Sequence, residues 1–325
     1  MERVIRVPEW AVRFADDFTG IERFERPVDP ATEPTITVTL PSDAYYEYGF
    51  FDAEGNLRAD PNAEEAADNP WYPSLSAITG PDWQPGELVG LDPASATGST
   101  DREHVPSAAL GQDRRIIVYT PAGYETTPLP TVYVQDGVAF FRIAKLHAVY
   151  EALLAQGRVQ PARLVLIEPG DRPAEYGYND NYVTFMTEEL PRWLRDQYDV
   201  HPDAYYLGAS LGGLASVLSA LANPTNAKGL ATLSGAFLGT PTNREFYATE
   251  ESWLLENAQD ILPKLPKWFL QTGKLEWLYD VNKQLARQLA TLGLPHKYVA
   301  KSAGHNWGNW SHSLAPALEF LLSRQ

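Results

Sequence analysis

Residues 204–213 read AYYLGASLGG, an apolar run followed by a serine set among glycines. The apolar run predicts a strand, and a helical pattern begins at Leu211. A side chain at Gly208 or Gly212 would clash in the sharp turn that lifts the Ser210 hydroxyl above the edge of the sheet. The start of the helix points free backbone N–H groups, that of Leu211 among them, toward the same place. The motif therefore predicts a serine nucleophile beside an oxyanion-binding site.

Short apolar strands alternate with helical runs on both sides of this turn. The expected strands are residues 115–120, 131–135, 164–168, 204–208, 231–235, 267–273 and 297–301. The expected helices are residues 141–156, 187–198, 211–221, 281–292 and 314–322. Strands that are apolar on both faces and separated by helices predict a mostly parallel sheet with helices on each side. The fold class that follows is α/β.

The N-terminal part of the chain has a different pattern, rich in strand signals. Residues 35–42 alternate β-branched residues, and residues 44–61 predict two strands around a turn at 52–55. A helical period is found there only in residues 10–18. Residues 80–100 are dense in Gly, Pro, Ser and Thr, which predicts a linker.

Charge divides the chain at about the same place. Residues 1–92 carry 6 basic and 19 acidic side chains, whereas residues 93–325 carry 20 basic and 23 acidic side chains. The net charge of the whole chain is -16. We therefore expect a β domain over residues 1–92 and an α/β domain over residues 93–325. The negative field repels nucleic acid and anionic lipid, which argues against a nucleic-acid-binding role. The hydrophobic content of 44% is that of a globular protein and excludes disorder as a global description.

Cysteine is absent from the sequence, and so are targeting signals. Without cysteine, no disulfide, thiol nucleophile or thiolate metal site can form. No apolar run approaches the roughly 18 residues of a membrane span, and the start, MERVIRVPEW, lacks the features of a secretory signal. For a full-length chain these features predict a cytoplasmic protein without membrane contact.

A serine hydroxyl needs a base, and three of the six histidines follow Ser210. His305 comes after the strand expected at 297–301 and before the last helix, where an α/β hydrolase places its base. His296 precedes that strand, which puts it at the opposite edge of the sheet. His312 is expected in the first turn or the cap of a helix. His305 is thus the predicted base, the alternative being a polar loop residue.

An acid is needed to hold the other imidazole nitrogen and to stabilise the imidazolium. Glu276 comes three residues after the strand that ends at Gly273. Asp280 is the alternative, but a helix is expected to have begun there, and a carboxylate in the first turn often serves only to offset the helix dipole. Glu276 is the predicted acid.

A second oxyanion donor is expected after an early strand. Residues 131–135 run into Asp136 and Gly137, and the glycine permits a close approach of the backbone. The N–H of Val138 or Gly137 would complete the hole with that of Leu211. The alternative is a plain strand-to-helix turn that requires glycine.

Several ordered motifs together resemble the enterochelin esterase and esterase D-like branch of the α/β hydrolases. They are VYVQDG (132–137), RPAEY (172–176), ELP (189–191), GASLGG (208–213), the spacing from Gly273 to Glu276, and AGHNWGNW (303–310). The likeness spans about residues 110–325 and implies an α/β-hydrolase fold with esterase activity. The chain departs from the family pattern at Ala303, where a second glycine is usual, and at Asn306, where an aspartate is common.

The N-terminal part resembles the same family. YGFF (48–51), DPN (60–62) and NP (69–70) are similar to the immunoglobulin-like β-sandwich that precedes the hydrolase in enterochelin esterases. The resemblance implies this layout without implying a ligand. Trp71, Tyr72 and Trp83 are candidates for a sugar platform, with packing in a core or interface as the alternative.

Further substrate-binding residues are expected near the site. The resemblance implies such a role for Arg172, which is suited to an anionic or catechol oxygen, and the alternative is a structural ion pair with Glu175. Trp307 and Trp310 flank His305 and are candidates for the wall of an acyl or aryl pocket. Their alternative is packing under the last helix.

The leading hypothesis is a serine esterase that uses Ser210, His305 and Glu276, forms an acyl-enzyme and needs no cofactor or metal. Its expected partner is a small-molecule ester, which the resemblance implies is a siderophore lactone and which a carbohydrate-linked acyl ester or simple carboxylic ester also fits. A second hypothesis is acyl transfer to a sugar or alcohol. A third is a non-catalytic protein that binds glycans through the β domain. The oligomeric state is not predicted.

Overall fold

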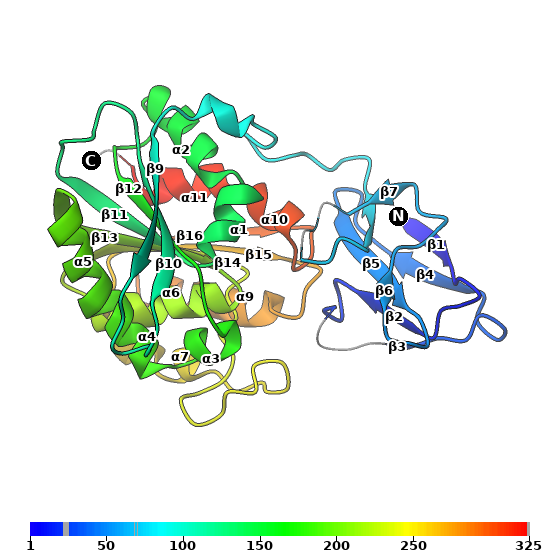
Figure 1. Cartoon of the computed structure of the whole chain (residues 1–325). Coiled ribbons are helices and arrows are strands. Elements are labelled where there is room, and N and C mark those ends of the chain that lie inside the picture. The colour runs from blue at the N-terminus through cyan, green and yellow to red at the C-terminus, as the bar shows by residue number, and fades with distance from the viewer. Residues whose placement is uncertain (22–25, 68, 70, 324–325) are drawn as a thin grey trace. The chain divides into compact units, whose positions relative to one another are not determined.

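A computed structural model describes residues 1–21, 26–67, 69 and 71–323, and these residues form two compact units (Figure 1). The first unit comprises Met1–Pro85, Thr272–Tyr279 and Ala300–His312. The second comprises Gly86–Gln271, Asp280–Val299 and Ser313–Gln325. Two short segments of the expected α/β region therefore group with the N-terminal residues, and the boundary near residue 92 remains a prediction. Pro70, from the NP motif, lies outside the described residues.

Two β-sheets build the first unit. In the smaller sheet, β1 (Glu2–Arg6) pairs with β4 (Thr35–Thr39). The larger sheet has the order β3-β2-β5-β8-β7, with β6 beside β5. Its strands are β2 (Arg13–Asp16), β3 (Arg26–Pro27), β5 (Tyr45–Phe51), β6 (Leu57–Arg58), β7 (Glu65–Ala66) and β8 (Ser76–Thr79). Side chains from both sheets share one core, so the unit is a β-sandwich.

The helical period at residues 10–18 does not produce a helix, because this segment contains strand β2. Phe14 pairs with Phe50 of β5, and the two rings lie 5.3 Å apart. A strand partner so distant in sequence decides the conformation here, and a local helical period does not report it. The strands expected at 35–42 and 44–61 are confirmed by β4, β5 and β6.

An eight-stranded mixed sheet organises the second unit, in the order β16-β15-β14-β13-β11-β12-β10-β9. Its parallel part consists of β11 to β15, and β10 runs antiparallel to both neighbours. The strands are β9 (Ser99–Val105), β10 (Arg114–Thr120), β11 (Leu129–Val134), β12 (Arg163–Ile167), β13 (Val200–Ala209), β14 (Ala227–Leu233), β15 (Trp268–Gly273) and β16 (His296–Lys301). Each expected strand is present, and the central ones are buried along most of their length, as the apolar runs require.

Helices cover both faces of this sheet. Figure 1 shows α2 (Leu146–Ala155) and α11 (Leu314–Leu321) on one side, with α6 (Leu211–Ala222) and α9 (Tyr279–Thr291) on the other. The other α-helices of this unit are α1 (Gly137–Arg142), α3 (Arg172–Tyr176), α4 (Asp180–Thr184), α5 (Leu190–Gln197), α7 (Trp253–Glu256) and α8 (Ala258–Ile261), whereas α10 (Trp307–Ser311) belongs to the first unit. A mixed sheet between two helical layers confirms the predicted α/β-hydrolase class.

Two of the expected helices differ in detail. The run at 141–156 is divided into α1 and α2, because Lys145 has a φ of 51° that interrupts the helix. The run at 187–198 becomes α5, which a π-helical turn, η2 (Phe185–Glu189), joins to α4. The sequence period predicts these helices correctly but not their interruptions.

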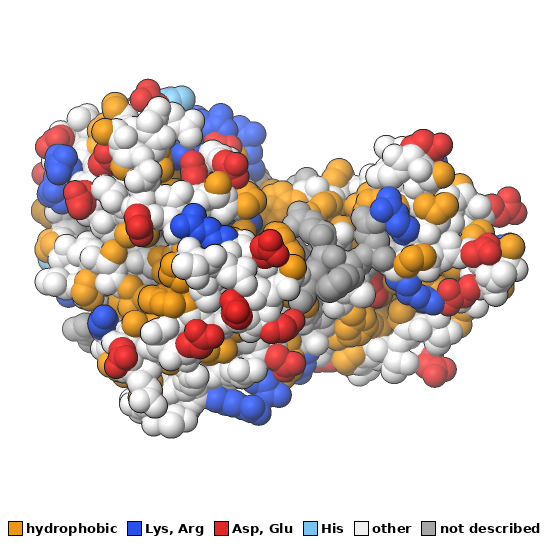
Figure 2. Space-filling model, turned by 90° about the horizontal axis from the view of Figure 1, so that it is seen from below, with side chains coloured by type: hydrophobic (Ala, Val, Ile, Leu, Met, Phe, Trp, Pro, Cys, Tyr) orange, Lys and Arg blue, Asp and Glu red, His pale blue; other side chains and the backbone are white. Residues whose placement is uncertain are grey.

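Acidic side chains are dispersed over the face of both units that Figure 2 draws. Within the described residues, no helix is both long enough and apolar enough to cross a bilayer.

Candidate active site

Ser210 lies in the turn between β13 and α6, with a φ of 55° and a ψ of -127°. Its N–H donates to Leu233 O at 2.9 Å, so the neighbouring strand fixes the turn. A Cβ on Gly208 would lie 2.2 Å from Gly212 O, which leaves no room for a side chain. The strained backbone and the obligatory glycine are what a turn that exposes a nucleophile requires.

Two backbone N–H groups near this turn are candidates for an oxyanion hole. Leu211 is the first residue of α6, and Val138 is in the first turn of α1, so neither N–H has an acceptor within its own helix. Across the part of the chain that the structure describes, neither has another acceptor. A Cβ on Gly137 would lie 2.2 Å from the backbone of Leu166, so glycine is required there for packing as well.

Arg172 connects the segments that carry these two N–H groups. Its Nε and Nη2 donate to the Asp136 carboxylate at 2.7 and 2.9 Å, and Nη2 donates to Ala209 O at 3.2 Å. Burial of the guanidinium lowers its pKa, but Asp136 more than offsets this, and the pKa of Arg172 is raised. Asp136 precedes Gly137 and Ala209 precedes Ser210, so the guanidinium holds both sides of the candidate hole.

The alternative pairing of Arg172 with Glu175 is wrong. The Glu175 carboxylate instead bonds with Arg114 and accepts from Gly170 N–H at 2.9 Å. Asp136 is the partner of Arg172 because the bidentate geometry suits its carboxylate, which is only 5% exposed.

Glu276 and His305 lie together in the first unit. His305 Nδ1 is 2.7 Å from Glu276 Oε2, and Glu276 Oε1 accepts from Gly273 N–H at 2.9 Å and from the Thr272 hydroxyl. The Glu276 side chain is 0% exposed, and that of His305 is 13% exposed. A buried carboxylate with its second oxygen anchored can fix both the tautomer and the orientation of the imidazole.

The competing residues lie elsewhere. Asp280 is exposed in the first turn of α9, where it offsets the helix dipole. His296 opens β16 and its Nδ1 is 2.9 Å from Leu294 O, whereas His312 caps the C-terminal end of α10. These positions agree with the places expected for them.

Aromatic rings surround His305 within the same unit. The Trp277 ring centroid is 4.5 Å from that of His305, and Trp310 meets His305 edge-on at 5.0 Å. Trp307 is buried, and its ring contacts those of Trp310 and Trp71. The Trp310 ring is fully buried, so of these two rings only the half-buried Trp277 offers a surface for a flat acyl or aryl group.

The platform candidates also have defined contacts. Trp71 packs edge-on against Trp307 and Trp310 and is 38% exposed. Trp83 packs against Tyr45 and stacks on His312. Much of this aromatic surface is therefore engaged within the unit, as the packing alternative expects.

Sequence reasoning missed two residues of the site. Trp277 follows Glu276 directly, and a ring adjacent to a predicted acid is a signal that could have been used. Asp136 was read only as part of the turn before Gly137. Its φ of 54° and its pairing with Arg172 have no local sequence signal.

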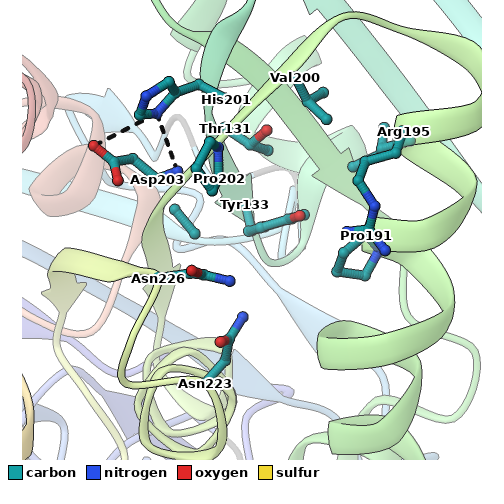
Figure 3. A pocket seen from close by; sticks show the side chains of 12 residues that line it. Thr131, Tyr133, Pro191, Arg195, Val200, His201, Pro202, Asp203, Asn223 and Asn226 are labelled. Carbon is teal, nitrogen blue, oxygen red and sulfur yellow. Dashed lines mark hydrogen bonds and ion pairs between the residues drawn. The ribbon is translucent and has the colours of Figure 1, made fainter.

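A separate cavity of about 130 Å³ lies at the opposite edge of the sheet (Figure 3). Thr131 near the start of β11 and Val200 at the start of β13 line it, with Arg195 from α5 on one side and Asn226 on the other. Ser210 follows the far end of β13, about 20 Å along the strand from Ala204, which also lines the cavity, at the usual rise per residue. This cavity is therefore distinct from the serine turn.

Residues 107–321 match the family model described as "Putative esterase". Among curated proteins, "Uncharacterized protein YbbA" of Bacillus subtilis is 27% identical over 146 residues, which are 38% of this chain and 58% of that protein. "Iron(III) salmochelin esterase" of Escherichia coli O6:H1 is 23% identical over 224 residues, 65% of this chain and 55% of that protein. The chain thus spans little more than half the length of each of these relatives.

The fold has a solved counterpart over nearly its whole length. The ferric enterobactin esterase from Salmonella typhimurium is 19% identical, with a TM-score of 0.74 over 98% of this chain and 92% of that chain. At this identity the likeness supports the fold alone.

Proposed function

We propose that this chain, which belongs to the family described as putative esterases, is a carboxylic ester hydrolase, namely a serine esterase with Ser210, His305 and Glu276 as its triad. The observation that carries the proposal is the 2.7 Å contact between Glu276 Oε2 and His305 Nδ1. The positive-φ turn at Ser210 supports it, since this backbone geometry presents a nucleophile at the end of a strand.

Acylation begins when Ser210 Oγ attacks the ester carbonyl carbon and its proton passes to His305 Nε2. Glu276 holds the Nδ1–H and stabilises the imidazolium that forms. The N–H groups of Leu211 and Val138, with Gly137 N–H as the alternative to the latter, donate to the oxyanion. Collapse of the tetrahedral intermediate expels the alcohol, which takes the proton from His305.

Deacylation repeats these steps with water. His305 removes a proton from the water, the hydroxide attacks the acyl carbon, and Ser210 leaves with the returned proton. The ester, water and the named side chains carry every proton and electron pair, so the proposal invokes no cofactor.

The substrate class that we propose first is a siderophore lactone, because one curated relative is named as a salmochelin esterase. The half-buried Trp277 ring beside His305 suits an aromatic acyl group. The net charge of -16 opposes an anionic ferric catecholate, so simple aryl or carbohydrate-linked acyl esters are the competing class. Comparing kcat/KM for a catechol lactone, with and without iron, against aryl esters from acetyl to octanoyl separates the two.

Covalent labelling tests the nucleophile. A fluorophosphonate should add once to the protein, and peptide mapping should place the adduct on Ser210. Ser210→Ala should lose the adduct and lower kcat by about 10³-fold or more. Ser216→Ala is the matched control, since this buried hydroxyl of α6 has no partner among the described residues. Full ester hydrolysis by Ser210→Ala would defeat the proposal.

Two other activities predict different results. An acyltransferase, which shares the triad, would give an acylated sugar or alcohol when an acceptor is added, whereas an esterase gives free acid. A glycan-binding protein would show neither adduct nor turnover while folded, and would be retarded on a glycan affinity gel.

A further inference from the structure

The loop that carries His305 rests on a carboxylate from the start of the chain. Asp17 follows strand β2 and is 2% exposed. Asn306 Nδ2 donates to its two oxygens at 3.3 and 3.0 Å. A Cβ on Gly304 would lie 1.8 Å from Asp17 Cγ, so the carboxylate packs directly against the Gly304 backbone. Both neighbours of His305 are thus in contact with Asp17.

The β-sandwich holds Asp17 firmly in this position. Glu47 N–H donates to Asp17 Oδ2 at 2.6 Å, and Asp17 N–H donates to Glu47 O at 3.1 Å. Two residues earlier on the same strand, Tyr45 N–H donates to Ser302 O at 2.9 Å. The His305 loop is therefore bound to β5 both through Asp17 and through the backbone of Tyr45.

Asn306 links Asp17 to the start of α10, on the other side of His305. While its Nδ2 reaches Asp17, its Oδ1 accepts from Asn309 N–H at 2.8 Å and caps α10. Asn309 Nδ2 in turn donates to Gly304 O at 2.8 Å. His305 lies between two residues joined by this closed set of hydrogen bonds, so little freedom remains in the backbone that aims its ring at Glu276.

We propose that Asp17 is a positioning residue for His305: by fixing Gly304 and Asn306, it sets the angle at which the imidazole meets Glu276. The inference rests on the proposed function, in which His305 is the base. It assigns to the β-sandwich a part in catalysis, independent of any ligand that this unit binds.

The hydrogen bonds of Asp17 decide the choice of variants. Its two oxygens accept from Glu47 N–H and from Asn306 Nδ2. Asparagine at this position keeps one acceptor oxygen but sets its NH2 group against one of these two donors. Asp17→Asn should therefore have an intermediate effect, whereas Asp17→Ala removes the contact.

The first experiment compares Asp17→Ala with Asp60→Ala, a matched loss of a buried carboxylate in the same unit. Asp60 bonds Tyr48 and Asn62 and none of the residues of the His305 loop. For Asp17→Ala we expect kcat to fall about 10–100-fold with KM changed less than about threefold, because a small misplacement of a catalytic group costs this much. Asp60→Ala should keep kcat within about twofold, and Asp17→Asn should lie between the two.

A second readout reports the His305–Glu276 bond itself. The downfield proton NMR signal of His305 Nδ1–H, identified by its loss in His305→Ala, should shift or broaden in Asp17→Ala and remain in Asp60→Ala. A variant that is merely less stable would keep this signal under native conditions. A kcat equal to that of the wild type, together with an unchanged His305 Nδ1–H signal in Asp17→Ala, would overturn the inference while leaving the proposed function intact. An active His305→Ala would instead refute the proposed function.

Should Asp17→Ala fail to fold, a charge exchange gives the same test. N306D sets two carboxylates against each other but keeps an acceptor for the cap of α10, so kcat should fall at least tenfold. The double variant D17N/N306D restores a donor–acceptor pair and should recover a large part of that loss. Additive losses in the double variant would show that the two side chains do not act together, contrary to the inference.

Discussion

Replacing Arg172 with methionine should damage both stability and turnover, because the guanidinium is the partner of a buried carboxylate. Asp136 is 5% exposed and receives two bonds from Arg172 at 2.7 and 2.9 Å. Methionine fills much of the same volume but donates no hydrogen bond to Asp136. The change therefore leaves the carboxylate unpaired and releases Ala209 O, which Arg172 also binds.

The size of the effect follows from these contacts. Breaking a buried ion pair by removing one partner costs about 3–5 kcal/mol. Relaxation of the turn and partial hydration through the opening left by the 22% exposed Arg172 reduce this, so we expect a loss of about 3 kcal/mol. Loss of one oxyanion donor typically lowers kcat by about 10²–10³-fold. A Val138 N–H that is displaced but still present should lower kcat less, by about 10–100-fold.

Urea unfolding followed by tryptophan fluorescence measures the first quantity, and steady-state kinetics on a neutral and an anionic ester measure the second. Arg115→Met is the control, since its ion pair with Glu168 is at the surface and is expected to contribute at most about 1 kcal/mol. Arg172→Lys should be intermediate, because an ammonium cannot reproduce the bidentate geometry.

The substrate-binding prediction for Arg172 gives the opposite pattern. It predicts a raised KM for the anionic ester alone, with stability and kcat on the neutral ester unchanged. That result, or an Arg172→Met protein as stable as Arg115→Met, would refute the structural role argued from the pair with Asp136.

Three other outcomes are expected. Glu276→Gln should lower kcat by about 10³–10⁴-fold with little change in KM, whereas Asp280→Asn should stay within about twofold in the same assay. Gly208→Ala should lower unfolding free energy by at least about 2 kcal/mol and slow labelling by fluorophosphonate, because its Cβ would meet Gly212 O at 2.2 Å. Burial lowers the pKa of Lys301 to about 8 from 10.5, so the charged form costs stability below pH 8 and the cost disappears as pH rises to 10.5. Relative to Lys301→Met, the free energy of unfolding of the wild type should rise by about 2 kcal/mol between pH 7.5 and 10.5, measured by urea unfolding. A difference in unfolding free energy between the two proteins that does not change with pH would contradict this.

The α/β architecture was predictable because its signal is local. Strands buried on both faces must be apolar throughout, and the short runs at 131–135 and 164–168 have this pattern. The glycines around Ser210 are equally local, since their steric requirement arises within six residues of chain. Elements and turns of this kind are visible before any tertiary contact is known.

Contacts between distant segments were not predictable from the same signals. Local spacing offered Glu175 as an alternative partner of Arg172, yet Asp136 takes that place across two parallel strands. The contact of Asp17 with Asn306 joins residues 289 positions apart. Such pairings depend on how the strands are ordered in the sheets, and a single sequence carries no direct record of that order.

The acidic excess of residues 1–92 shows how composition misleads when burial is unknown. Five of its 19 acidic residues, Asp16, Asp17, Glu47, Asp52 and Asp60, are at most 6% exposed, and each accepts hydrogen bonds from side chains or backbone of its own unit. A buried, hydrogen-bonded carboxyl acts on its neighbours far more than on an approaching ligand. The charge that seemed to mark a separate acidic surface is in part internal structure, and one of those carboxyls bears on the backbone of the proposed catalytic histidine.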